Sequence, residues 1–268
     1  MTVRLPKSDH ESVAPPPLAA AAASPTVPSD LSTLLVKAAP PPFSGHCREA
    51  ASSNPTLINS AITAAGMTTS SSLNFLVHMA ILESRLESFA QAGTSTASGL
   101  FQFTDQTWLA LVKRHGARYG LKVYADAIIK DHGQWVVLGR NMRQRILALR
   151  QDPTLSAIMA AEFAKENAAI MRQTLGRAPT DGELYVAHFL GARDAVKLIN
   201  ARTTMPGHES TALFPAAARS NPWIFRKPDG EPRSVAELYD LLTRGPSPEE
   251  IAMFCRKGYQ PAQLAAGS

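Results

Sequence analysis

The sequence predicts a mostly α-helical fold, and three observations support this. Apolar residues recur at helical spacing through most of the chain after residue 55, alternating strand patterns are nearly absent, and several segments begin with helix-capping signals. The chain has 268 residues, of which 45% are hydrophobic and 18% charged. This is enough for one sizeable hydrophobic core, or at most two small ones.

The composition divides the chain into three parts. Residues 1–54 hold nine of the 20 prolines together with Ala- and Ser-rich runs. Such a composition does not bury a core, so we expect a disordered Pro/Ala-rich tail. A helical domain is expected over residues 55–245 and a C-terminal tail over 246–268.

The expected helices follow one another from residue 56 onward. They are Thr56–Ala65, residues 73–89, Asp105–Tyr119, Lys122–Lys130, Arg140–Arg150, Thr154–Leu175, Asp181–Asn200, Ala212–Ser220 and Val235–Arg244. The strongest is the apolar segment LNFLVHMAILESRLESF at 73–89. A small hairpin is expected at Phe225–Arg233, where Asp229-Gly230 is a turn signal.

Several of these helices have recognisable ends. Gly66 is expected to end the first helix, and the three serines at 70–72 offer a cap for the second. Asp105 can cap the third, and Asp152 stands before a first-turn proline. Thr180 and Glu183 have the spacing of a capping box.

Charge and cysteines set limits on partners and cofactors. The net charge of +5 and pI of about 9.4 suit an anionic partner, and equally suit a solvated surface. The sequence does not show the alternation of basic and aromatic residues that would predict nucleic-acid binding. Cys47 and Cys255 are too few for a disulfide scaffold and lack metal-ligand spacing, so we expect no metal and no cofactor. The sequence has no apolar run of about 18 residues, so no membrane span is expected. The N-terminal segment makes a poor signal peptide.

Glu83 is the first candidate for chemistry. On a helical wheel of about 100° per residue, its neighbours are apolar, including Met79 and Ala80, whereas His78 and Arg85 mark the polar side. An ionised carboxylate on an apolar face is costly unless it is paired. Glu83 is therefore expected either to form a buried ion pair or to have a raised pKa, as a general acid requires. Glu87, one turn further on, is expected to be more exposed to solvent than Glu83.

A loop of small polar residues and an aromatic-glutamine cluster follow. The loop is Thr94–Gly99, and the cluster is Leu100-Phe101-Gln102-Phe103. A glutamine amide both donates and accepts hydrogen bonds, which suits sugar hydroxyls or an N-acetyl group. The pattern fits a carbohydrate-cleaving site, and it also fits a core segment with one exposed glutamine.

These residues resemble a known family. Glu83-Ser84 followed by Gly99-Leu100-Phe101-Gln102-Phe103 is similar to the first motif of lytic transglycosylases with the soluble-transglycosylase fold. The segment Glu183–Ala192, with its His-Phe-Leu-Gly run, is similar to the second motif in phage endolysins and related proteobacterial proteins. The likeness covers about residues 55–245, and the two motifs stand about 80 residues apart.

The resemblance implies a lysozyme-like helical domain with a saccharide-binding groove. It implies cleavage of the β-1,4 bond between N-acetylmuramic acid and N-acetylglucosamine in peptidoglycan glycan strands, in the periplasm or at the cell wall, by a protein expected to be a monomer. By motif, Glu83 is the catalytic acid and base, accompanied by Ser84, while Gln102, Phe103 and Tyr185 match substrate-contacting positions. The sequence departs from the commoner Tyr-Asn-Ala-Gly pattern of the family by placing Ala187 and His188 there, so a role that needs that asparagine is not carried over.

The predicted mechanism uses one carboxyl group. Protonated Glu83 donates to the glycosidic oxygen and then accepts the proton of the muramic acid 6-hydroxyl, which yields a 1,6-anhydro product without water. A muramidase is the alternative, with Glu87, Asp105 or Glu162 supplying a second carboxylate. Another alternative is a non-catalytic protein that binds or assembles cell wall.

Four further residues remain open at this point. Glu162 lies in an apolar segment and is a candidate for the groove or for a paired core glutamate. His188 fits a sugar contact or a hydrogen-bonded core histidine. Trp108 and Trp135 fit groove platforms or core packing.

Overall fold

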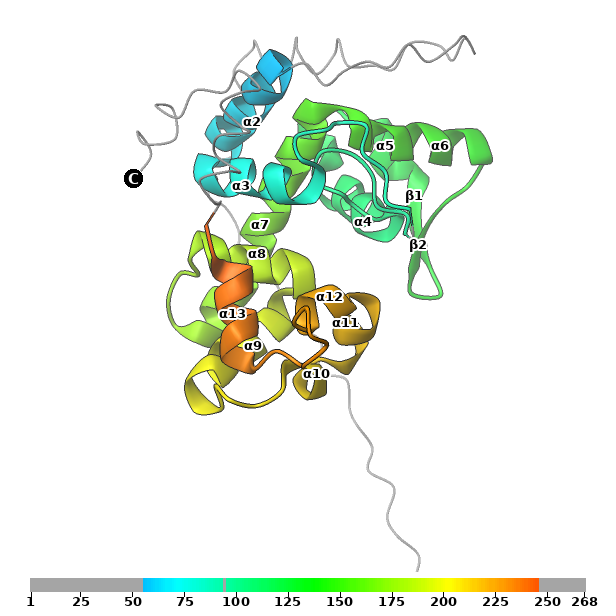
Figure 1. Ribbon diagram of the computed structural model, residues 1–268. Coiled ribbons are helices and arrows are strands. Elements are labelled where there is room, and N and C mark those ends of the chain that lie inside the picture. The colour runs from blue at the N-terminus through cyan, green and yellow to red at the C-terminus, as the bar shows by residue number, and fades with distance from the viewer. Residues whose placement is uncertain (1–54, 94, 246–268) are drawn as a thin grey trace, which may run out of the picture.

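The computed structural model describes residues 55–93 and 95–245, and it is mostly helical. The predicted tails at 1–54 and 246–268, with Cys47 and Cys255, lie outside these residues. Figure 1 shows the elements, which in chain order are α2 (Pro55–Thr69), α3 (Leu73–Ser84), α4 (Asp105–His115), η1 (Gly116–Tyr119), α5 (Lys122–Ala127), β1 (Ile128–Asp131), β2 (Gln134–Val137), α6 (Arg140–Ala148), η2 (Leu149–Gln151), α7 (Pro153–Leu175), α8 (Asp181–Leu190), α9 (Ala192–Thr204), α10 (Ser210–Leu213), α11 (Pro215–Ser220), α12 (Pro222–Phe225) and α13 (Val235–Thr243).

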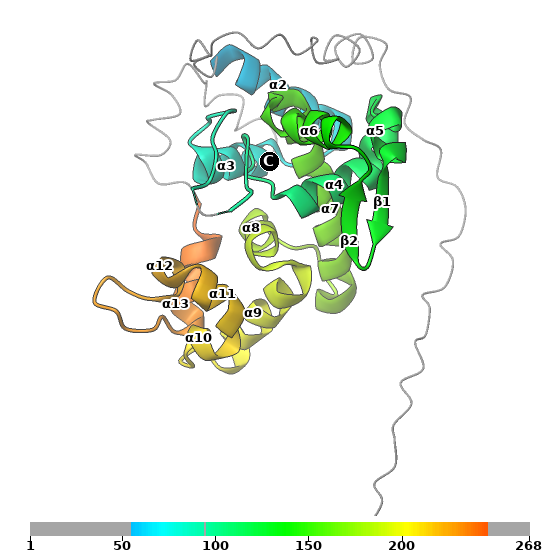
Figure 2. The same ribbon diagram turned by 90° about the vertical axis from the view of Figure 1, so that its right-hand side faces the viewer.

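The buried apolar side chains form two clusters. The first is built from α2, α3, the 98–103 segment, α4 and the first half of α7, and the second from α8 to α13. Helix α7 joins them, since Ile158 belongs to the first cluster and Met171 to the second. In Figures 1 and 2, α7 runs from the part of the fold around α2 to α6 down to the part around α8 to α13.

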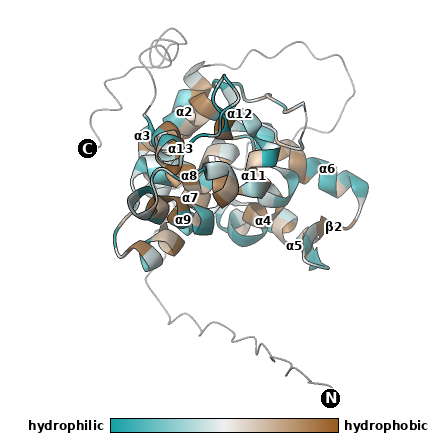
Figure 3. Ribbon diagram, turned by 60° about the horizontal axis from the view of Figure 1, so that its bottom comes forward, coloured by the Kyte–Doolittle hydropathy of each residue, from teal (hydrophilic) through white to brown (hydrophobic). Residues whose placement is uncertain are grey.

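The hydropathy colouring agrees with this packing. Figure 3 shows both apolar and polar residues along most helices, as expected when each helix buries one side. Within the described residues, no helix combines the length and the hydropathy that crossing a membrane requires.

Most predicted helix starts are confirmed. The Oγ of Ser72 accepts a hydrogen bond from the Phe75 amide at 3.2 Å, and Asp152 accepts from the Leu155 amide at 2.9 Å ahead of the first-turn proline. The capping box of Thr180 and Glu183 is present in both directions. The prediction for Asp105 is wrong: Thr104 caps α4, and the Asp105 carboxylate instead pairs with arginines.

Helix α3 ends five residues earlier than predicted. Arg85 and Leu86 both take left-handed backbone conformations, with φ of 52° and 66°, and their amides close the helix on the carbonyls of Ile81 and Ala80. Glu83 is therefore in the last turn of the helix. Glu87 lies outside it and is exposed, so the expectation that Glu87 follows one helical turn after Glu83 is wrong.

Other predicted boundaries also differ. The helix expected over Ala212–Ser220 is two short helices, α10 and α11, which are separated at Phe214. The helix expected to reach Lys130 stops at Ala127 and gives way to the antiparallel β1–β2 pair, whose turn uses left-handed His132 and Gly133. The helix expected over 181–200 is broken at Gly191, where φ is 85°. The first helix instead continues through Gly66 to Thr69.

The hairpin predicted near Asp229-Gly230 is reduced to an isolated antiparallel bridge between Arg226 and Pro232.

Candidate functional site

The carboxyl group of Glu83 is largely shielded from solvent. Its side chain is 19% exposed, and within the described part of the chain neither arginine nor lysine forms an ion pair with it. Burial raises the pKa of Glu83 from 4.5 to about 7. A carboxylate is also disfavoured in the last turn of a helix, because the free carbonyl groups carry partial negative charge. Of the two expectations from the sequence, the structure supports the raised pKa.

His188, in the last turn of α8, is the ionisable neighbour of Glu83. Its Nε2 atom lies 3.5 Å from Oε1 of Glu83, and its side chain is 14% exposed. Burial lowers the pKa of His188 from 6.5 to about 4. Between about pH 4 and 7 both groups are therefore neutral, so the contact joins a carboxylic acid and an imidazole rather than an ion pair. The distance is longer than a normal hydrogen bond.

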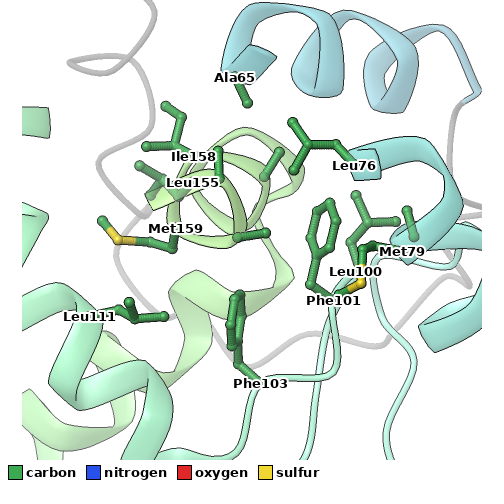
Figure 4. Packing of buried hydrophobic residues seen from close by; sticks show 14 of the residues in the cluster. Ala65, Leu76, Met79, Leu100, Phe101, Phe103, Leu111, Leu155, Ile158 and Met159 are labelled. Carbon is green, nitrogen blue, oxygen red and sulfur yellow. The ribbon is translucent and has the colours of Figure 1, made fainter. Parts of the chain in front are cut away.

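Two phenylalanine rings pack against the imidazole of His188. Phe103 and Phe163 each form a T-shaped aromatic pair with it, at centroid distances of 6.2 and 5.9 Å. Phe103 is 1% exposed, and Figure 4 shows it projecting from its loop towards α7 in the hydrophobic cluster. Phe103 is therefore a core residue that packs against His188, and its burial does not support the predicted substrate contact. Phe163 was missed, because a phenylalanine in an apolar helix carries no functional signal.

Ser84 ties the end of α3 to the following loop. It is 8% exposed, and its Oγ lies 2.8 Å from the carbonyl oxygen of Leu100 and 3.1 Å from that of Ala80. The same oxygen accepts a hydrogen bond from the Glu87 amide at 3.2 Å. The hydroxyl is thus engaged within the protein, which explains how Ser84 holds the helix end and does not support the predicted substrate contact.

Gln102 also holds the loop. It has a left-handed backbone, with φ of 48°, and its Nε2 donates to the carbonyl groups of Gly99 at 2.9 Å and Ala90 at 3.2 Å. Both donors of the amide are used by these contacts. The prediction that this amide donates to a sugar is therefore not supported by the geometry.

Arg150 anchors the same loop from the other side. Its guanidinium donates to the carbonyl oxygens of Thr96 at 2.6 Å and Phe103 at 2.9 Å, and it pairs with Asp105 at 2.9 Å. Gly99 packs directly on the Arg150 backbone. Sequence reasoning missed Arg150, whose only signal is a charged residue at the end of the apolar segment Ile146–Leu149.

Tyr185 contacts α3 through an aromatic pair. It is half-buried, and its ring stacks on His78 with centroids 6.0 Å apart and an interplanar angle of 27°. His78 is itself buried, at 7% exposure, so the prediction that it marks a polar side of α3 is wrong. The pair joins α8 to α3 and helps to set the position of His188 relative to Glu83.

Glu162 belongs to a separate group of charges. It is 3% exposed, and it pairs with Arg118 at 2.9 Å and accepts a hydrogen bond from the hydroxyl of Tyr119. His115 and Lys165 lie 3.6 Å from its other oxygen. Its carboxylate is held between α4, η1 and α7, so the interpretation as a paired core glutamate is confirmed and the predicted substrate contact is not supported.

The two candidate tryptophans differ. Trp108 is completely buried, and its indole Nε1 donates to the Ile146 carbonyl at 2.7 Å, so it packs in the core. Trp135 is half-buried on β2, with the Lys130 ammonium 5.5 Å from its ring centroid. Neither ring is in contact with Glu83.

Glu83 lines neither of two cavities in the described part of the chain. One, of about 330 Å³, lies between the 91–98 loop and the segment 144–151. The other, of about 370 Å³, lies among α10, α11 and α12. The saccharide groove beside Glu83 remains a prediction.

The raised pKa of Glu83 predicts a pH-dependent cost to stability. Between pH 4.5 and about 7 the folded protein keeps a proton that the unfolded chain has released, so its free energy of unfolding falls as pH rises through this range. The loss approaches about 3 kcal/mol by the conversion of pKa shifts to free energy. Glu83→Gln, which has no charge to bury, should be more stable than the wild type at pH 8 and similar to it at pH 4.5. Urea unfolding of both proteins at the two pH values measures this, and equal stability at pH 8 would contradict it.

The structure brings some predicted site residues together and separates others. Glu83 and His188 are in direct contact, with Phe103 behind His188, whereas Ser84 and Gln102 hold the adjoining loop, Tyr185 packs on His78, and Glu162 lies in another cluster. The likeness to lytic transglycosylases thus rests on two sequence motifs. A comparison of the chain with models of known protein families finds none that matches.

Proposed function

We propose that the protein is a peptidoglycan lytic transglycosylase in which Glu83 is both the acid and the base. The observation that carries this proposal is a shielded carboxyl group with no cationic partner among the described residues, whose pKa is raised to about 7. A group with this pKa is protonated in a useful fraction of molecules near neutral pH, and it also accepts a proton readily. The substrate would place the protein's action in the periplasm or at the cell wall.

The reaction needs no second protein carboxylate. Protonated Glu83 donates its proton to the glycosidic oxygen as the bond to C1 of N-acetylmuramic acid breaks, and the N-acetyl group of that sugar stabilises the positive charge at C1. The 6-hydroxyl oxygen of the same sugar then bonds to C1 and passes its proton to Glu83. Glu83 returns to its starting state, and the product carries a 1,6-anhydro ring.

The surroundings of the other acidic residues favour this reaction over hydrolysis by a muramidase. Glu87 is exposed outside the helix, Asp105 pairs with Arg143 and Arg150, and Glu162 is enclosed by cations. A hydrolase of the two-carboxylate type needs a second carboxylate on the opposite side of the scissile bond. Asp105 and Glu162 are thus already held by cations of the protein.

His188 fits a positioning role in this mechanism. Because burial holds its pKa near 4, it does not supply a positive charge that would ionise Glu83 at neutral pH. Its ring is fixed by Phe103 and Phe163, so it limits where the carboxyl group can turn. We propose that His188 orients the protonated carboxyl towards the glycosidic oxygen.

Product analysis distinguishes the three candidate functions. Incubation of the full chain with purified insoluble peptidoglycan should release soluble muropeptides whose mass, by high-resolution mass spectrometry, is one water lower than that of hydrolysis products. Products with an intact reducing end would instead indicate a muramidase. Retention of the protein on the polymer without release of muropeptides would indicate a binding or assembly protein.

A further inference from the structure

A second candidate site lies in the cavity of about 370 Å³ among α10, α11 and α12. Its walls come from six residues: Thr211, Pro215, Ala218, Arg219, Pro222 and Arg226. In Figures 1 and 2 these short helices lie apart from α3, with α8 between them. The volume is within the range of small-ligand sites. The cavity is therefore distinct from the surroundings of Glu83.

Both charged residues in the wall of this cavity are arginines. Residues 211–228 contain three cations and no acidic residue, and Asp229 and Glu231 follow in the turn that contains Gly230. Lys227 pairs with Glu237 at 2.9 Å, but Arg226 donates only to the Gly230 carbonyl, at 2.8 Å, and the exposed side chain of Arg219 has no hydrogen bond or ion pair within the described residues. The acidic group in contact with a wall residue is Glu209, which accepts a hydrogen bond from the Thr211 hydroxyl at 3.3 Å. Two guanidinium groups thus remain available to an anion.

An exposed aromatic residue stands next to the cavity wall. Trp223 directly follows Pro222 and is 68% exposed, an unusual state for a large aromatic side chain. Exposed tryptophan faces provide stacking surfaces for ring-shaped ligands that also carry polar groups. Guanidinium groups recognise carboxylates through paired, charge-assisted hydrogen bonds. The combination suits a ring with an attached carboxylate better than a bare anion.

We propose that the cavity among α10, α11 and α12 binds a saccharide that carries a carboxylate. Arg219 and Arg226 hold the carboxylate, and Trp223 packs against the sugar ring. The proposal concerns binding only, and it does not depend on catalysis at Glu83. It gives the positive charge of this part of the chain a specific ligand class.

Isothermal titration calorimetry with a defined probe tests the proposal. The probe is a trimer of galacturonic acid, and the neutral trimer of N-acetylglucosamine is the uncharged comparison. Arg219→Gln and Arg226→Gln should each weaken binding of the acidic trimer at least about tenfold, as expected when a charge-assisted hydrogen bond is lost. Trp223→Ala should weaken it several-fold. Arg145→Gln, at an exposed arginine of α6 outside the cavity, is the matched control and should leave binding unchanged.

Further arms separate this proposal from its competitors and from the enzyme proposal. Binding should be kept in Glu83→Gln, so failure at Glu83 and failure of this site give different results. Absence of binding to the acidic trimer, or binding that survives the double arginine substitution, would overturn the proposal. Equal or tighter binding of tri-glutamate or of inorganic phosphate would overturn its saccharide part. Thermal unfolding of each variant checks that it is folded, and the exposed positions of the three side chains make this the expected outcome.

Discussion

Replacing Glu83 by Gln is expected to lower the release of soluble muropeptides from peptidoglycan at least about a hundredfold, the scale of a lost acid–base group. The amide keeps the shape of the side chain and its place beside His188, but it has no transferable proton of suitable pKa. Both steps of the proposed mechanism would fail, since donation to the glycosidic oxygen and acceptance from the 6-hydroxyl use the same group. Initial rates of muropeptide release, followed by liquid chromatography, measure the effect.

Glu87→Gln is the matched control for this experiment. It makes the same chemical change four residues further along, at an exposed side chain outside the helix. We expect its rate to stay within a factor of about two of the wild type, as is usual for an exposed residue away from a site. Wild-type rates in Glu83→Gln would remove this carboxyl group from the mechanism, whatever the stability of the variant.

Gly99→Ala should lower the free energy of unfolding severely, by about 3–5 kcal/mol. A Cβ atom at residue 99 would lie 2.0 Å from the Arg150 carbonyl oxygen and 2.8 Å from its carbonyl carbon, and both are backbone atoms that cannot turn aside. The backbone φ of 84° is also unfavourable for alanine. Relief of the clash requires separating the loop from η2, which breaks the bonds from Arg150 to Thr96 and Phe103. Urea unfolding at fixed pH gives the free-energy change.

Gly207→Ala tests whether the loss of stability comes from the close approach of residue 99 to Arg150 or from replacing any glycine by alanine. A Cβ at Gly207 would meet nothing within 4 Å, and its φ lies outside the left-handed range. Its free energy of unfolding should change by less than about 1 kcal/mol, with either sign. If Gly99→Ala proved as mild as Gly207→Ala, the close approach of the loop to Arg150 would be wrong.

Local signals allowed much of the helical layout to be predicted. Caps act within a few residues of where they stand, so Ser72, Asp152 and the Thr180–Glu183 pair marked their helices correctly. Helix ends were harder, because α3 stops at two left-handed residues that are arginine and leucine rather than glycine. No local propensity favours that ending, and it is the contact between Ser84 and the Leu100 carbonyl that supports it.

The β1–β2 hairpin carried a signal that was overlooked. Two tetrapeptides rich in apolar residues flank His132-Gly133, a two-residue turn in which both positions have positive φ. Such turns usually carry Asn-Gly or Asp-Gly. Because histidine stood in the first position, the helical pattern of the preceding segment was extended too far.

The candidate site was predictable only in its central residue. Glu83 could be singled out because an acidic residue among apolar neighbours is unusual in a helical sequence. Its contact with His188 depends on how α3 and α8 pack, which the sequence does not reveal. The motif residues Ser84, Gly99 and Gln102 are explained by loop construction: each makes a contact that shapes the segment after α3. In this structure these three residues therefore support the segment next to Glu83.

The continuous helix α7 has a consequence for how the protein can be divided. Because Ile158 and Met171 of one helix belong to different apolar clusters, a cut within α7 breaks the helix that links the two clusters, even where each fragment keeps its own cluster. Separately expressed halves should aggregate or stay unstructured, and recombining them should restore structure only where the broken helix can re-form. We therefore expect the two apolar clusters on either side of α7 to unfold together, as one cooperative unit.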